Sequence, residues 1–110
     1  MLTSDDYQPT AVNPNPRREA DARLTASPNP TRGGTRVAFA LPTAGRTRVA
    51  LYDVGGREVR VLADGDLMAG PQQLMWDGRD SDGRTVASGV YLCRISAGGV
   101  ATLARIAVVR

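Results

Sequence analysis

The chain of 110 residues contains no histidine, and all 14 of its basic residues are arginine. Without histidine, catalysis by a Ser-His-Asp or Cys-His arrangement, metal ligation by imidazole and a charge switch near neutral pH are excluded. Without lysine, Schiff-base chemistry and a P-loop phosphate site are excluded as well. These absences remove several large classes of catalyst, and we predict that the protein is not an enzyme and holds no cofactor.

Cysteine occurs once, so no disulfide can form within the chain. Cys93 lies in the apolar run Val90–Ile95, where a small buried hydrophobic side chain is its expected role. A reactive thiol needs a cationic neighbour, and the adjacent Arg94 would point to the opposite face of a strand. We therefore expect an inert, structural thiol.

Aromatic residues make up only 5% of the chain, and no apolar run reaches the ~20 residues of a membrane helix. The core must be built mainly from Val, Ala, Leu and Ile, a composition that favours strands. Only Tyr7 and Tyr52 could offer an exposed ring to a sugar, which disfavours a carbohydrate site. The formal charge is +3, but the arginines are scattered from Arg17 to Arg110, as on solvated strand faces. We predict neither nucleic-acid binding nor membrane insertion.

The amino-acid composition and the apolar pattern of the chain change at about residue 22. Residues 1–22 contain three prolines and almost no apolar periodicity, which is typical of a flexible linker or tail. Met1–Pro9 is polar and acidic, unlike a secretion signal, so an exported protein would have to start further upstream. Residues 23–110 contain short apolar runs separated by turn residues, the pattern of an all-β sandwich.

Alternation of apolar residues predicts six strands in residues 23–110, or seven if Leu24–Ala26 counts as a strand. The alternating sets are Val37, Phe39 and Leu41; Val49 and Leu51; Tyr91, Cys93 and Ile95; and Thr102, Ala104, Ile106 and Val108. Val59 and Val61 form another run, which Ala63–Asp66 is expected to break, and Gly70–Trp76 forms the next strand. No helical periodicity is present, so helix content should be near zero.

The stretch Trp76–Arg84, followed by Gly89-Val90-Tyr91, predicts a corner between two strands. Trp76, the only tryptophan, should be buried between the sheets, and Asp77 should accept backbone hydrogen bonds in its turn. Six residues define this structural motif: Trp76, Asp77, Gly78, Gly83, Gly89 and Tyr91.

Three aspartates in this corner raise the possibility of a calcium loop. Asp77, Asp80 and Asp82 do not fit the EF-hand spacing in either register tried, because the ligand, glycine and glutamate positions fall on the wrong residues. Turn capping explains the cluster better, and we predict no metal site.

Two other motifs are interpreted as turns. Leu41–Gly45 resembles a sortase signal with its threonine one place early, and it is followed by strands, so a hairpin loop is expected. The glycine pairs at 33–34, 55–56 and 98–99 open no helix and therefore offer no phosphate site. Asp53 and Glu58 flank a hairpin and are not paired for acid–base catalysis.

Taken in order, these segments resemble one known family over about residues 27–110. The matching segments are Pro28-Asn29-Pro30, Val37–Pro42, Leu51–Val59, Leu62, Ala69-Gly70, Trp76–Asp80, Gly83, Ser88–Tyr91 and Val108–Arg110. They resemble the C-terminal Ig-like module of the flagellar hook-capping protein and the related type IX secretion sorting domains.

The resemblance implies a seven-stranded antiparallel Ig-like (fibronectin III-like) β-sandwich without catalytic activity. It also implies a C-terminal sorting or anchoring module of an exported protein, at the surface of a Gram-negative bacterium or outside the cell, that a type IX-like secretion machinery reads. The strand expected to be read comprises Ile106, Ala107, Val108, Val109 and Arg110. The alternative is a structural Ig-like spacer, or a subunit that self-associates or docks on protein partners through edge strands or the N-terminal tail.

Overall fold

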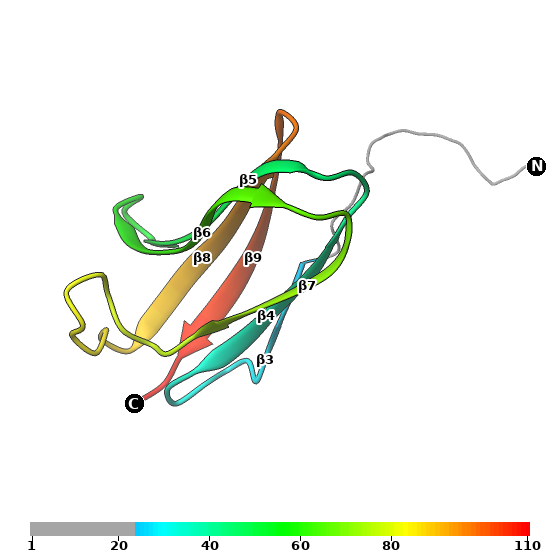
Figure 1. Ribbon diagram of the computed structural model, residues 1–110. Coiled ribbons are helices and arrows are strands. Elements are labelled where there is room, and N and C mark those ends of the chain that lie inside the picture. The colour runs from blue at the N-terminus through cyan, green and yellow to red at the C-terminus, as the bar shows by residue number, and fades with distance from the viewer. Residues whose placement is uncertain (1–23) are drawn as a thin grey trace, which may run out of the picture.

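The computed structural model describes residues 24–110, so the predicted tail of residues 1–22 lies outside the described residues. This part of the chain folds into seven strands and contains no helix, and therefore no helix that could cross a membrane (Figure 1). The strands are β3 (Thr25–Ser27), β4 (Thr35–Leu41), β5 (Gly45–Asp53), β6 (Glu58–Leu67), β7 (Gly70–Trp76), β8 (Gly89–Ala97) and β9 (Val100–Val108).

The strands form two sheets, one with the order β3-β4-β7 and one with the order β6-β5-β8-β9. All five strand pairings within these sheets are antiparallel. The prediction of an all-β, seven-stranded antiparallel sandwich is confirmed, including the short first strand, whose observed bounds are one residue later than expected.

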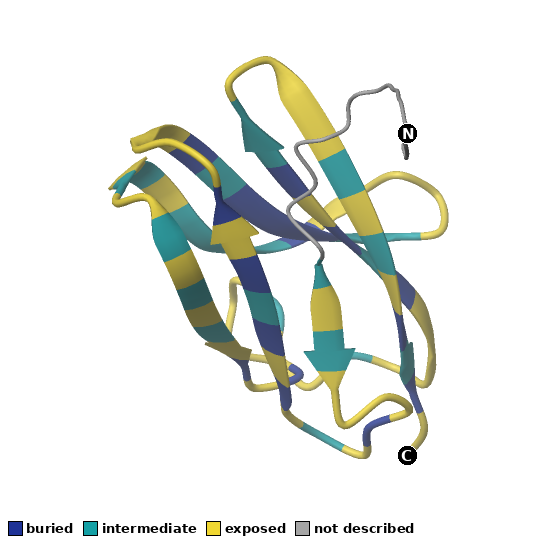
Figure 2. Cartoon of the chain, turned by 90° about the vertical axis from the view of Figure 1, so that its right-hand side faces the viewer, coloured by how far each residue is buried: buried dark blue, intermediate teal, exposed yellow. Residues whose placement is uncertain are grey.

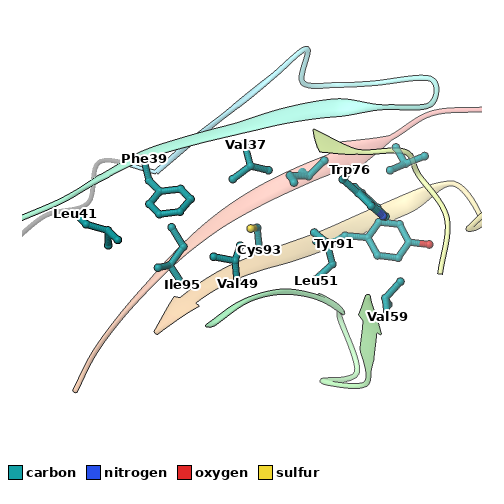
Figure 3. Close-up of a cluster of buried hydrophobic side chains, with 12 residues drawn as sticks. Val37, Phe39, Leu41, Val49, Leu51, Val59, Trp76, Tyr91, Cys93 and Ile95 are labelled. Carbon is teal, nitrogen blue, oxygen red and sulfur yellow. The ribbon is translucent and has the colours of Figure 1, made fainter. Parts of the chain in front are cut away.

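The core lies between the two sheets and follows from the alternation of apolar residues (Figures 2 and 3). Along β4 and β8 every second residue is buried, because successive side chains of a strand point to opposite faces. Twelve buried side chains form the cluster: Val37, Phe39, Leu41, Val49, Leu51, Val59, Trp76, Tyr91, Cys93, Ile95, Ile106 and Val108. Each large aliphatic member contributes roughly 1.5–3 kcal/mol relative to an exposed side chain.

Strand β6 departs from the sequence prediction. The expected break at Ala63–Asp66 is wrong, because β6 continues through this segment to Leu67. Two register shifts against β5 make the longer strand possible, and between them Val61 lies opposite Ala50 instead of beside the core. Of the two valines expected to alternate on the buried face, only Val59 belongs to the core, with 7% of its surface exposed.

The sandwich has two different ends. At the corner end lie the loop that follows Trp76, the β5–β6 loop, the β3–β4 connection and Arg110 (Figure 1). At the open end, the β4–β5 turn and the Gly98-Gly99 turn between β8 and β9 border a common pocket. The two ends carry different candidate sites, which are described next.

Candidate functional site

The corner end is organised around Trp76. Its side chain is fully buried, and its indole Nε1 donates a hydrogen bond of 2.9 Å to the carbonyl of Arg79. The ring meets Tyr91 edge to face, with centroids 5.6 Å apart (Figure 3). The Tyr91 hydroxyl in turn donates to the carbonyl of Ala87 at 2.7 Å. Both aromatic residues thus satisfy their polar atoms on the loop that joins β7 to β8, which fixes the loop to the core.

Two loops at this end have the same local structure. Asp53 and Asp80 each begin a five-residue segment Asp-x-x-Gly-Arg, and each carboxylate Oδ1 accepts the backbone N–H groups of the residues two and four places later. In both loops the fourth residue is a glycine with positive φ, 89° at Gly56 and 82° at Gly83. A backbone hydrogen bond from the N–H of Ser81 to the carbonyl of Val59 ties the second loop to the start of β6, directly after the first loop.

The aspartates of the corner therefore act as turn caps. Asp77 Oδ1 accepts the N–H of Arg79 at 3.0 Å and forms an ion pair with Arg60, which confirms the expected backbone bond. Asp80 is occupied by two N–H groups, as described above. Within residues 24–110, no three Asp, Glu or Cys side chains are grouped closely enough to hold a metal ion.

Arg110 closes the corner end with a three-way contact. Its Nε donates to the carbonyl of Val86, its Nη1 to that of Arg32 and its Nη2 to that of Gly78, at 3.0, 2.8 and 3.0 Å. Its backbone N–H donates to the Ser88 hydroxyl. A guanidinium has several donors in a fixed fork, and here the fork joins the β3–β4 connection to two points of the β7–β8 loop. We name this contact the Arg110 clamp.

Glycine is required where the loops meet beneath the clamp. Gly78 has a φ of 75°, and a Cβ at this position would lie 2.5 Å from the Gly33 carbonyl oxygen. A Cβ at Gly34 would lie 3.0 Å from the Trp76 carbonyl oxygen. The close approach of the β3–β4 connection to the corner thus depends on missing side chains at Gly78 and Gly34.

The strand predicted to be read by a secretion machinery is firmly held. Ile106 and Val108 are buried in the core, while Val109 is 48% exposed. Along the outer edge, the side-chain amide of Asn29 donates to the carbonyl of Arg105 and accepts the N–H of Ala107.

Beyond Asn29, the backbone of Thr31 continues this edge pairing. Its N–H donates to the carbonyl of Ala107, and its carbonyl accepts the N–H of Val109. The segment from Asn29 to Thr31 thus pairs in parallel with residues 105–109, which comprise the end of β9 and the residue after it. We call this part of the strand the lower half of β9, and its outer edge is occupied.

Cys93 is fully buried in the core, as the sequence predicts. Burial raises the pKa of its thiol to about 12, because the thiolate would lose its hydration. The thiol stays protonated at neutral pH and is not available as a nucleophile.

A surface hollow lies at each end of the sandwich. Between the two Asp-x-x-Gly-Arg loops lies a hollow of about 570 Å³ with charged walls, whose carboxylates Asp53 and Asp80 are already used as caps. At the open end lies a mainly apolar pocket of about 380 Å³ between the end of β4 and the start of β9, bordered by the segment Leu41–Thr47. The prediction of a hairpin loop at Leu41–Gly45 is wrong, because this segment connects β4 of one sheet to β5 of the other and the two strands do not pair.

Two residues of the corner end carry roles that sequence reasoning misses. The sequence marks Asn29 only as part of Pro28-Asn29-Pro30, and Arg110 only as part of a terminal strand. The partners of Asn29 lie 76 and 78 residues away in the sequence and those of Arg110 lie 22 to 78 residues away, so no local pattern reveals them.

Fold and corner together define an Ig-like β-sandwich module whose polar side chains mainly hold loops. The chain belongs to the FlgD Ig-like domain family, whose model matches residues 25–99.

Among curated proteins, the chain is similar to the basal-body rod modification protein FlgD of Salmonella typhimurium and to that of Salmonella typhi. Each is 41% identical over 54 residues, which cover 49% of this chain and 23% of the relative. The chain therefore spans about a quarter of the length of the relatives it matches.

Solved structures with the same fold come from two settings. One is PorZ, a bacterial surface component of the type-IX secretion system of Porphyromonas gingivalis, at 28% identity and a TM-score of 0.52 over 80% of this chain and 12% of PorZ. Another is FlgD from Xanthomonas campestris, studied for hook capping in flagellar assembly, at 24% identity and a TM-score of 0.54 over 80% of this chain and 62% of that one. Dimeric latent PorU from P. gingivalis has a TM-score of 0.61 at 22% identity, over 78% of this chain and 9% of PorU. The last two show the fold alone.

Proposed function

We propose that this domain is a non-catalytic structural module of an exported protein and acts through contacts with other proteins. The observation that carries the proposal is the family match over residues 25–99. Its FlgD relatives are basal-body and hook-capping proteins by name, and such roles require binding surfaces rather than catalysis.

The corner end supports a structural role. In the aspartates that resemble a binding loop, Oδ1 of Asp77 accepts from one backbone N–H and from Arg60, and Oδ1 of Asp80 accepts from two backbone N–H groups. The indole N–H of Trp76 and the hydroxyl of Tyr91 donate hydrogen bonds to loop carbonyls. Side chains used in this way make a rigid end to the module, so contacts with partners would have to form elsewhere on it.

A chimera tests this function. In Salmonella FlgD, the region that matches this chain is replaced by residues 24–110, and swimming of a strain without its own FlgD is measured in soft agar. We expect motility above that of the deletion strain, because an Ig-like module of the same family should support the same assembly. A chimera carrying Trp76→Ala serves as the destabilised control, and one carrying Met75→Ala, which changes an exposed neighbour, as the matched control. Absence of hooks despite normal levels of folded, exported chimera would contradict the proposal.

A second candidate is a sorting module that a type IX-like machinery reads at the surface of a Gram-negative cell. The similarity to PorZ at 28% identity favours it. The structure changes how it should be tested, because deleting residues 106–110 would remove Ile106 and Val108 from the core and Arg110 from its clamp. A sequence signal must therefore be probed by substitutions that spare the fold.

The suitable variant is Val109→Asp, which alters an exposed side chain of the last strand. Residues 24–110 are fused to a periplasmic reporter in a type IX-competent host, with and without this change. A sorting module delivers the reporter to the cell surface, and Val109→Asp reduces delivery while the fusion stays folded. Retention of the unmodified fusion in the periplasm would rule out this candidate and leave the structural role.

A further inference from the structure

Most of the sheet edges in this sandwich are blocked against pairing with another chain. Edge strand β7 contains Pro71, and edge strand β6 carries Asp64, Asp66 and two register shifts. Edge strand β3 has only three residues, and the lower half of β9 is covered by the segment from Asn29 to Thr31. Proline, charge, bulges, short length and coverage are the known ways to protect an edge. The upper half of β9, Val100–Arg105, contains no proline or register shift, and no described residue forms a backbone hydrogen bond to its outer edge before the Arg105 carbonyl, which Asn29 binds.

In this open half of β9, the backbone N–H and carbonyl groups of alternate residues point away from the sheet. The pairing of β8 with β9 runs without a shift from Gly89–Val108 to Ala97–Val100. Because the carbonyl of Arg105 and the N–H of Ala107 face the outer edge, the groups of alternate residues, Leu103 and Ala101, face it as well. Neither Leu103 nor Ala101 takes part in a backbone hydrogen bond on that side within residues 24–110. Among residues 24–110, the N–H and carbonyl groups of Ala101 and Leu103 thus remain available to pair with another strand.

The two faces beside this edge have different chemistry. On the inner side, Val100 and Thr102 border the apolar pocket of the open end. On the outer side, Leu103 is 58% exposed and lies opposite Arg94, and the next such pair is Arg105 with Leu92. Neither arginine forms an ion pair with any carboxylate in the described part of the chain. A strand that fits here has apolar side chains inward and carboxylates outward.

A second copy of this edge does not have that chemistry. Antiparallel pairing of two β9 strands about Leu103 would place Arg105 opposite Ala101 of the other copy. The unpaired Arg94 and Arg105 of both copies would then share one face with no carboxylate between them. Like charges on neighbouring strands are destabilising, so charge favours a partner of opposite sign.

We propose that Val100–Arg105 of β9 is a docking edge that accepts an extended acidic strand from a partner protein, by addition to the sheet β6-β5-β8-β9. This inference rests on the proposed function as an interaction module and names its surface and the class of its partner. Main-chain bonds to Ala101 and Leu103 supply affinity, while Arg94 and Arg105 select acidic side chains.

The test measures fluorescence anisotropy of the full chain with a labelled peptide that alternates valine and glutamate, and with a matched peptide that alternates valine and lysine. We expect saturable binding of the glutamate peptide at low salt, at least about tenfold tighter than the lysine peptide. Leu103→Pro removes an outward N–H without breaking the bonds to β8, and should weaken binding by about tenfold. Leu103→Ala, which keeps the N–H, is the matched control and should bind within a few-fold of the unmodified chain.

A charge reversal gives a second, independent variant. Arg105→Glu should reverse the preference toward the lysine peptide, whereas Arg36→Glu, an exposed change on the other sheet, should leave it unchanged. Unaltered binding by folded Leu103→Pro or Arg105→Glu, or no binding of the glutamate peptide, would overturn the inference.

Other occupants of the edge are also distinguishable. Self-association that Leu103→Pro abolishes would assign the edge to a second copy, and displacement of the probe by a peptide of residues 1–23 would assign it to the chain's own N-terminal segment; either result overturns the inference. A chimera that restores motility while the peptide fails to bind would refute the docking edge and leave the proposed function standing.

Discussion

Removing the Trp76 side chain is the sharpest test of how this fold is held together. The side chain has no exposed area, and large aromatic residues bury roughly 150–250 Å² each. Truncation of a buried Trp to Ala costs ~3–5 kcal/mol in other cores. The lost hydrogen bond to Arg79 and the lost edge contact with Tyr91 place Trp76→Ala in the upper part of this range.

The size of this loss predicts a change that is easy to observe. The total stability of a single domain is ~5–15 kcal/mol, so Trp76→Ala should remove a large part of it. A loss of ~4 kcal/mol corresponds to a fall in Tm of roughly 15–30 °C for a domain of this size. Trp76→Phe keeps a ring against Tyr91 and loses the indole N–H, so it should cost only ~1–2 kcal/mol.

The assay is urea unfolding followed by far-UV circular dichroism, because the variants lack the only tryptophan and its fluorescence. Met75→Ala, next to Trp76 but 64% exposed, is the matched control and should change the free energy of unfolding by less than about 0.5 kcal/mol. If Trp76→Ala unfolds at the same urea concentration as the unmodified chain, the corner does not anchor the fold. If Trp76→Phe and Trp76→Ala are equally destabilised, the lost hydrogen bond rather than packing would be the main contribution.

Three further perturbations test the other contacts. Asp80→Ala should cost ~1–2 kcal/mol of unfolding free energy in urea titrations, because two backbone N–H groups lose their acceptor, whereas the exposed Asp82→Ala should be nearly neutral. Arg110→Met should lower the free energy of unfolding by ~1–3 kcal/mol and speed hydrogen exchange in the two clamped loops; unchanged exchange would show that the clamp is not needed to order them. Because burial raises the pKa of Cys93 from 9.0 to about 12, the folded state holds this proton more tightly, so stability is intact below about pH 9 and falls as pH rises toward 12. Cys93→Ala should remove this part of the slope of unfolding free energy against pH, and an unchanged slope would refute the assignment.

Much of the architecture could be predicted because it depends on the alternation of apolar and polar residues over short distances in the sequence. Val37, Phe39 and Leu41 alternate in the sequence and share the buried face, and Tyr91 and Cys93 do the same in β8. Turn residues such as Gly98-Gly99 also occur where the chain reverses. These features depend on neighbours two to four residues away, which a sequence displays directly.

The prediction fails where pairing between strands decides the structure. Ala63–Asp66 has the composition of a turn, yet it forms a ladder with Arg46–Val49 of β5. The Arg46 and Arg48 side chains opposite provide ion pairs for Asp64, which makes a charged segment acceptable at this edge. Cross-strand partners of this kind override the local preference for a turn.

The candidate site follows the same division. The capping role of Asp77 was predictable because its backbone partner lies two residues away. The role of Asn29 was not, since Asn-Pro dipeptides ordinarily indicate only a turn. Its amide completes the edge of β9, and no repeat, charge pattern or spacing marks residues 29 and 107 as partners.

The tie between Asn29, Arg110 and their distant partners also sets the order of events during synthesis. Asn29 and the carbonyl of Arg32 each contact residues 76 to 78 positions later, in the last six residues of this sequence. Until those residues have left the ribosome, or a translocation channel that moves the chain from its N-terminus, the sheets can associate but these ties cannot form. Contacts of such long sequence separation also form slowly. The module therefore remains incomplete through most of its own passage, and its final residues complete it.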